Sequence, residues 1–346
     1  MSDEYLWDGS GAPDADVARI ERALGRLRAP LPPPPALPAT PNQPRVLPFQ
    51  TRAYAGARFL GPALAAAAAI VLMIVATWQS ATTSRTWEVA RVAGEPRVDS
   101  TPLTGTGRIA VGETLATDAA SRARMDVSTI GQVTVDADTR VRLVETRKGR
   151  HQLALERGTL HAFITAPPGQ FVVNTPSSTA TDLGCVYTLQ VDEDGRGLLS
   201  VTAGWVAFEY KGRESFVPAR ASARTDPYFG PGTPRYDDAD APFRDALDQF
   251  DYPTKGYAGP EALAFVLGHA REKDAMTLWH LISRVDRGQR EAVVDALERR
   301  VPMPAGVTRD AVVNLDRAAL DLWWDSLGLR DTTWWRKWKG PYPAER

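Results

Sequence analysis

Alternating apolar and polar positions mark the middle of the chain. In the stretch SRARMDV, the side chains of Ala123, Met125 and Val127 share one face, and charged side chains occupy the other. The stretch TRVRLVE repeats this arrangement with Val141 and Leu143. Alternation with a period of two residues predicts half-buried β-strands. Further strands are expected near residues 133–135, 152–156, 159–165, 170–174, 185–191, 198–202 and 205–210.

Turn-forming residues separate these short strands. They are Lys148-Gly149, Arg157-Gly158, Pro167-Pro168-Gly169, Asp194-Gly195 and Ala203-Gly204. Glycine and proline at such positions supply the backbone angles that tight turns need. Many short strands joined by hairpin-length connections predict an all-β module across residues 86–225.

One stretch before this module is apolar and carries no charge. Residues 59–78 read FLGPALAAAAAIVLMIVATW, and twenty residues at ~1.5 Å each span about 30 Å, the thickness of a hydrocarbon core. Arg58 and Trp78 suit the two interfaces, so a transmembrane helix is predicted at 58–79. An Ala-rich buried helix is the alternative. A cleaved signal peptide fits poorly because a long segment precedes the apolar run.

Arginines flank this predicted span on both sides: Arg45, Arg52 and Arg58 in front, and Arg85 and Arg91 behind. The small excess in front favours a cytoplasmic N-terminus and an exported C-terminal part.

The segment before the span divides into an arm and a linker. Residues 30–57 begin with a run rich in proline, which predicts an extended spacer. Within the arm, residues 1–29, Asp14 is placed as an N-cap. An apolar stripe follows it: Val17, Ile20, Leu24 and Leu27. A helix this short is marginal alone, so the stripe is expected to contact a cytoplasmic protein, the inner membrane face or a second copy. A frayed tail is the remaining reading.

The pattern after the β module changes again. Five prolines predict a linker at 226–258, and helical spacing predicts a small all-α module at 259–330. The helix at 288–301 is expected to bury Val293, Val294 and Leu297, and one helix at 308–327 is expected to bury Val312, Leu315, Leu322 and Trp323. In the tail, 331–346, tryptophans alternate with cations. Trp334, Trp335 and Trp338 form either an interfacial patch or a cover folded back over the helices.

Composition excludes several function classes. The 346 residues carry a formal net charge of -1, which gives no electrostatic case for binding nucleic acid. One cysteine and four histidines make a Cys/His zinc site untenable. His269 and His280 are expected to be structural or on the surface, and the Asp136/Asp138 and Asp192–Asp194 clusters are expected to be turns. We therefore expect no catalytic residue, cofactor or metal, and no enzyme.

An ordered series of motifs runs through the β module: VGETLATDAASRARMDV, GQVTVDADTRVRL, LALERGTLHAFI, FVVNTPSSTATDLGCVYTLQV and LLSVTAGWVAFEY. This series resembles the periplasmic module of FecR-type regulators. Cys185 stands where that family most often has the threonine of its GT.F.V motif, and Tyr187 stands at the aromatic position. Because Cys185 shares parity with Tyr187, Leu189 and Val191, it is expected to be a buried packing residue.

The resemblance implies that the β module is a solenoid-like domain of stacked hairpins. Together with the patterns on either side of it, the expected fold is a transmembrane helix, then an all-β, solenoid-like domain, then a small all-α domain. It also implies a single-pass protein of the bacterial inner membrane with periplasmic C-terminal domains. In that family the cytoplasmic part controls a sigma factor, and the periplasmic part receives a signal from an outer-membrane partner. This chain departs from the family in its short cytoplasmic arm and its helical C-terminal module. A non-signalling envelope scaffold that contacts proteins or cell wall is the alternative.

Overall fold

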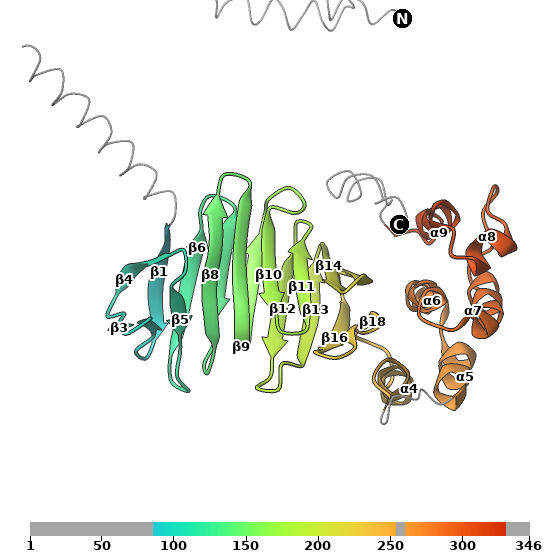
Figure 1. The fold of residues 1–346 in the computed structure, drawn as a ribbon, viewed down its shortest axis with the longest axis horizontal. Coiled ribbons are helices and arrows are strands. Elements are labelled where there is room, and N and C mark those ends of the chain that lie inside the picture. Colours follow the sequence, from blue (N-terminus) through green and yellow to red (C-terminus); the bar gives the residue numbers. More distant parts are fainter. Residues whose placement is uncertain (1–85, 254–259, 330–346) are drawn as a thin grey trace, which may run out of the picture. The chain divides into compact units, whose positions relative to one another are not determined.

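The structure is a computed structural model and describes residues 86–253 and 260–329. Within these residues an all-β part is followed by an all-α part (Figure 1), as predicted. No helix among them is long and apolar enough to span a membrane. The predicted span at 58–79 lies outside the described residues, as do the arm and the proline-rich linker.

The strands form two sheets that share strand β9, Arg150–Ile164. Sheet 1 has the order β4-β1-β6-β7-β9-β12-β13-β16, with β17 and β18 paired to β16. Its other strands are β1 (Thr86–Ala93), β4 (Thr106–Ala110), β6 (Arg122–Val127), β7 (Gly131–Val135), β12 (Val186–Val191), β13 (Gly197–Ala203), β16 (Ala221–Asp226), β17 (Gly230–Pro231) and β18 (Arg235–Tyr236).

Sheet 2 has the order β3-β2-β5-β8-β9-β10-β11-β14-β15. Its other strands are β2 (Arg97–Val98), β3 (Thr101–Pro102), β5 (Thr114–Ala116), β8 (Arg140–Arg147), β10 (Phe171–Thr175), β11 (Ser178–Asp182), β14 (Trp205–Tyr210) and β15 (Arg213–Pro218). Strands β9 and β10 pair in parallel. Successive hairpins alternate between the sheets, with β12–β13 in sheet 1 and β14–β15 in sheet 2. The classification of this arrangement as a solenoid stays a prediction.

The period-two pattern correctly identifies the buried face of the strands. In β6 every second residue is buried, including Met125 at 0% exposure. Inward-facing side chains from both sheets, such as Leu143 and Leu189, belong to one apolar cluster. Burial of this surface is the main favourable contribution to folding of the β part.

The turn predicted at Arg157-Gly158 is wrong, because β9 continues through it. Arg157 pairs with β8 in sheet 2, whereas Gly158 pairs with β12 in sheet 1. Gly158 has φ +94°, and a Cβ there would lie 2.2 Å from the Thr139 hydroxyl oxygen. That hydroxyl oxygen accepts a hydrogen bond from the backbone N–H of Thr159 at 2.8 Å. The glycine therefore permits a close approach where the strand passes between sheets.

The helical part begins at Ala241, earlier than the predicted start at residue 259. The helices are α4 (Ala241–Asp251), α5 (Pro260–His269), the 3₁₀ turn η2 (Glu272–Asp274), α6 (Ala275–Ile282), α7 (Arg287–Glu298), α8 (Arg309–Val313) and α9 (Arg317–Asp325). The prediction of a linker at 226–258 is therefore wrong, since this segment contains β17, β18 and α4. Phe243 and Leu247 of α4 are buried in the helical core.

The single helix predicted at 308–327 is also wrong. The chain leaves α8, Leu315 adopts φ +61°, and the Asp316 carboxylate accepts a hydrogen bond from the backbone N–H of Ala319 at 2.9 Å to cap α9. This break turns Leu322 outward at 49% exposure, against the prediction. The expected burial of Val293, Val294, Leu297, Val312 and Trp323 is confirmed, and Leu315 is half-buried.

Candidate functional site

Helix α6 and the turn after it place polar side chains against strand β15, which is the edge strand of sheet 2. Strand β15 pairs with β14 on one side, and His280 and Arg284 contact its other side. The backbone N–H of Phe216 donates to Nε2 of His280 at 3.0 Å, and Arg284 donates to the Glu214 carbonyl at 2.9 Å. The Thr277 hydroxyl donates to the Pro234 carbonyl at 2.8 Å beside β18. Backbone groups that a further strand would satisfy are therefore satisfied by side chains.

The surroundings of His280 fix its protonation state. Nε2 accepts the Phe216 N–H, so the ring proton resides on Nδ1, which donates to the Met276 carbonyl at 2.8 Å. Burial, and then the positive charge of Arg284, lower the pKa of His280 to about 3. The imidazole is therefore neutral near pH 7 and acts as a structural hydrogen-bonding group, which agrees with the expectation for this residue.

A buried charge network lies next to His280. The carboxylate of Asp251, 1% exposed, accepts hydrogen bonds from Arg213, from Arg284 at 3.5 Å and from the Thr233 hydroxyl at 3.0 Å. Arg284 also donates to the Ser215 hydroxyl at 2.6 Å. Burial lowers the pKa of Arg284 to about 10, so the guanidinium remains charged at neutral pH. This network joins α4, β15 and the turn after α6, and removing one partner leaves a buried charge uncompensated.

Aromatic rings fill the same junction. The Trp324 ring packs against Trp279, Trp205 and Phe216 with ring centroids 4.8, 5.9 and 6.0 Å apart. The Trp279 indole N–H donates to the Leu320 carbonyl at 2.8 Å. Trp324 and Met276 belong to the apolar cluster of the β part. The helices and the sheets thus share one core at this junction.

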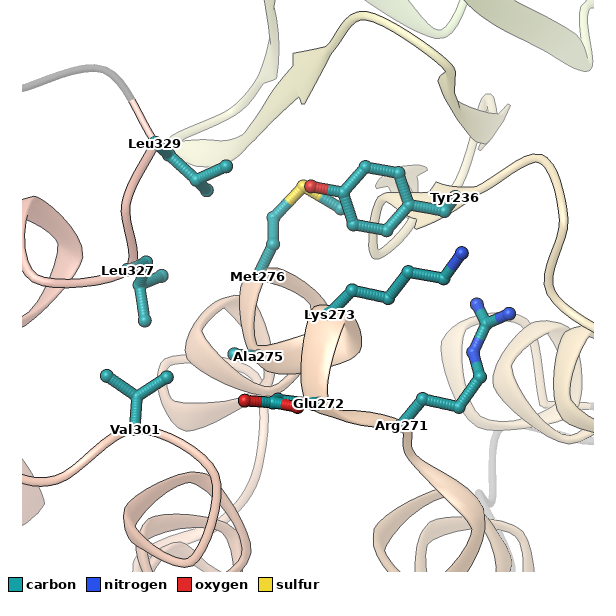
Figure 2. Close-up of a pocket in the computed structure, with 9 residues that line it drawn as sticks. All are labelled: Tyr236, Arg271, Glu272, Lys273, Ala275, Met276, Val301, Leu327 and Leu329. Atoms are coloured by element: carbon teal, nitrogen blue, oxygen red, sulfur yellow. The ribbon is translucent and has the colours of Figure 1, made fainter.

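A cavity of about 520 Å³ opens beside this shared core (Figure 2). It is lined by Tyr236, Arg271, Glu272, Lys273, Ala275, Met276, Val301, Leu327 and Leu329. In Figure 2 Tyr236 lies on one side of Met276, and Leu327 and Leu329 lie on the other side. Arg271 and Lys273 are engaged in ion pairs with Asp274 and Asp238. The cavity therefore offers an apolar wall with a charged rim.

The buried packing role expected for Cys185 is confirmed, with an addition. Cys185 and Tyr187 are 2% and 1% exposed. The Cys185 thiol donates to the Asp182 carboxylate, and burial raises the pKa of Asp182 to about 7 and raises the pKa of the thiol. Sequence reasoning missed Asp182. Its parity with Ser178 and Ala180, which are inward-facing in β11, is the signal that identifies it.

The candidate binding residues from the sequence lie outside the described residues. These are Val17, Ile20, Leu24 and Leu27 in the arm, and Trp334, Trp335 and Trp338 in the tail. His269 is exposed on α5 and its ring stacks on Phe265, apart from the buried His280. Across the described ranges, no group of three or more His, Cys, Asp or Glu side chains is arranged to hold a metal ion.

Comparison with known proteins identifies part of the β module. Residues 113–207 match the family model described as FecR protein, which confirms the resemblance inferred from the sequence motifs. The match runs from β5 into β14. No curated protein matches the chain.

Solved structures give a weaker likeness. Two crystal structures, at 1.65 and 2.50 Å resolution, of a protein from Parabacteroides distasonis proposed to be an anti-sigma factor are 17% identical to this chain, with a TM-score of 0.31. The alignment covers 39% of this chain and 64% of that one.

Proposed function

We propose that this chain is a single-pass inner-membrane regulator of the FecR type. The FecR domain at residues 113–207 is the observation that carries the proposal. In the proposed arrangement the span at 58–79 places this domain in the periplasm, where it receives a signal from a periplasmic or outer-membrane protein. The arm at 1–29 contacts a sigma factor in the cytoplasm. The role is regulatory and involves no catalysis or cofactor.

The apolar stripe of the arm supports the cytoplasmic half of the proposal. Val17, Ile20, Leu24 and Leu27 recur at helical spacing, with arginines off the stripe. An amphipathic helix of this length gains stability when its apolar face enters a groove on a partner. A sigma factor that offers such a groove is the partner we propose.

A pull-down with the full-length protein tests this partner. We expect the wild type to recover a sigma factor, and the double variant Ile20→Asp/Leu24→Asp to lose it, because two charges would enter the apolar contact. The variant Arg19→Ala/Arg22→Ala, changed off the stripe, is the matched control and should retain the partner. Recovery of no cytoplasmic transcription component by the wild type would sink the signalling role and favour the envelope scaffold.

Topology is tested separately by thiol labelling in cells. Because Cys185 is the single cysteine and is buried, background labelling by a membrane-impermeant maleimide should be low. We expect Ser80→Cys to be labelled once the outer membrane is permeabilised, and Ser2→Cys to be labelled after lysis. The reverse pattern would contradict the proposed orientation, and equal labelling of both would contradict a membrane span.

A further inference from the structure

The cavity beside α6 is lined in part by the last residues before the C-terminal tail. Leu327 and Leu329 form one wall, and residues 330–346 continue directly from that wall. We propose that the cavity is the docking site of this tail, with the indoles of Trp334 and Trp335 seated between α6 and β18.

The size and chemistry of the cavity fit aromatic rings. Its volume of about 520 Å³ lies within the range of about 300 to 1,000 Å³ that is typical of sites for organic ligands. Ala275, Met276 and Val301 line it together with the two leucines. A thioether beside an indole is a favourable contact, and Met276 is one of the residues that line the cavity.

Chain length permits the contact. Trp334 is five residues beyond Leu329, and five extended residues reach up to about 18 Å at ~3.3–3.6 Å each. The connection is also short enough to keep the local concentration of the tail high, on the order of millimolar for short flexible linkers. An intramolecular occupant therefore needs little intrinsic affinity to fill the site.

Charge at the rim favours the same occupant. Arg271 and Lys273 already form ion pairs with neighbouring aspartates, whereas the exposed Glu272 borders the cavity. The tail carries Arg336, Lys337 and Lys339 directly after the tryptophan pair. With the indoles in the cavity, these cations lie next to the Glu272 carboxylate.

The consequence is a strap across the junction. In this arrangement the tail follows α9, crosses the cavity, and contacts η2 and β18. It therefore strengthens the packing of the helices against the sheets. This inference does not depend on the proposed regulatory role, because it concerns contacts within the chain alone.

Hydrogen exchange on the full-length protein in detergent tests the contact. We expect Trp334→Ala/Trp335→Ala to raise amide exchange in residues 271–276 and around Val301 by at least tenfold, since the cover would be lost. The variant Thr332→Ala/Thr333→Ala changes the same tail without removing a ring, and should leave exchange there unchanged. Equal exchange in the wild type and the tryptophan variant would overturn the proposal.

A double-mutant cycle distinguishes direct packing from a general effect on stability. Val301→Ala and Trp335→Ala should each lower Tm, and the double variant should lose less than the sum, because both remove the same contact. Additive losses would contradict packing of Trp335 on this wall.

A membrane is the competing occupant. If the tail binds lipid instead, the tryptophan variant would lose binding to phosphatidylglycerol-containing vesicles and leave exchange at 271–276 unaltered. That pair of results would overturn docking in the cavity.

Discussion

The edge strands at the two ends of the paired sheets are protected in different ways. At the C-terminal end, edge strand β15 is covered by α6 and the turn after it, whose His280 and Arg284 side chains bond its backbone. At the N-terminal end, β3 pairs with β2 and β4 pairs with β1, and the described residues place no helix against them. These N-terminal strands are short, Pro102 lies in β3, and the exposed Arg108 lies in β4. Short strands, proline and charge discourage pairing with another chain.

This difference shows that the buried polar contacts lie at the covered end. The covered end holds a neutral histidine next to a buried ion pair of an arginine and an aspartate. The other end is protected by exposed features that need no partner. Loss of a residue at the covered end should therefore cost stability, whereas loss of a protective residue at the other end should change association.

The largest effect is expected at Arg284. Arg284→Met removes hydrogen bonds to β15 and leaves Asp251 with one arginine fewer, and breaking a buried pair costs about 3 to 5 kcal/mol in the free energy of unfolding. Urea denaturation of the purified protein measures it. Arg309→Met is the matched control, because its ion pairs with Glu291 and Asp295 are exposed and such pairs contribute about 0 to 1 kcal/mol. Equal losses in the free energy of unfolding for the two variants would contradict the difference between buried and exposed ion pairs.

His280 should make the covered end sensitive to acid. Unfolded histidine binds a proton below pH 6.5, whereas the low pKa of His280 keeps it neutral in the fold to about pH 3. Protons therefore favour unfolding, and the stability contributed by neutral His280 is lost as pH falls from 6.5 toward 3. Denaturation midpoints measured across this range should decline less steeply in His280→Gln. The same change at the exposed His269 should preserve the wild-type slope, and an unchanged slope in His280→Gln would contradict the account.

Asp182, between the two ends, should give a slope of opposite sign. Burial raises the pKa of this carboxyl to about 7 in the fold, against an ordinary value of 3.8. The associated stability is present below pH 3.8 and is lost as pH rises to 7. Asp182→Asn should remove that loss and make the protein more stable at pH 8, as read from thermal unfolding. Thr181→Asn, on the outward side of β11, is the control; a less stable Asp182→Asn at pH 8 would argue that the carboxylate is required.

The smallest change in stability is expected at the N-terminal end. Arg108→Val should alter the free energy of unfolding by less than about 0.5 kcal/mol, as surface substitutions usually do. It should nevertheless promote self-association, because the charge on edge strand β4 is removed. Light scattering as a function of concentration measures this. Arg142→Val lies on β8, which has β5 and β9 on its two sides, and should not associate; equal association of both variants would refute the role of the edge.

The strands and helices were predictable where one face is buried. Ala123, Met125 and Val127 alternate because β6 has one side in the core, and Cys185 follows from the same parity. Glycine was misleading at Gly158, since the residue that favours turns also permits close approach within a strand. Proline was misleading at 226–258. Pro242 lies in the first turn of α4, where proline is tolerated, and the Pro234 carbonyl accepts a hydrogen bond from α6.

The junction itself was not predictable from local pattern. Asp251 and Arg284 are 33 residues apart, and Phe216 and His280 are 64 apart. Nothing in the spacing of such residues indicates that they meet, because the contact depends on the packing of α6 against an edge that the sequence does not reveal. His280 was correctly interpreted as structural, but its partners required the structure.

Strand β9 also bears on the order in which the β part is completed during synthesis. It pairs with β7 and β12 in one sheet and with β8 and β10 in the other. When the ribosome has produced residues up to 164, β9 has its earlier neighbours but neither later one. A nascent chain at that stage exposes unfinished edges in both layers until residues 171–191 emerge. This interval is where a chaperone would be most needed.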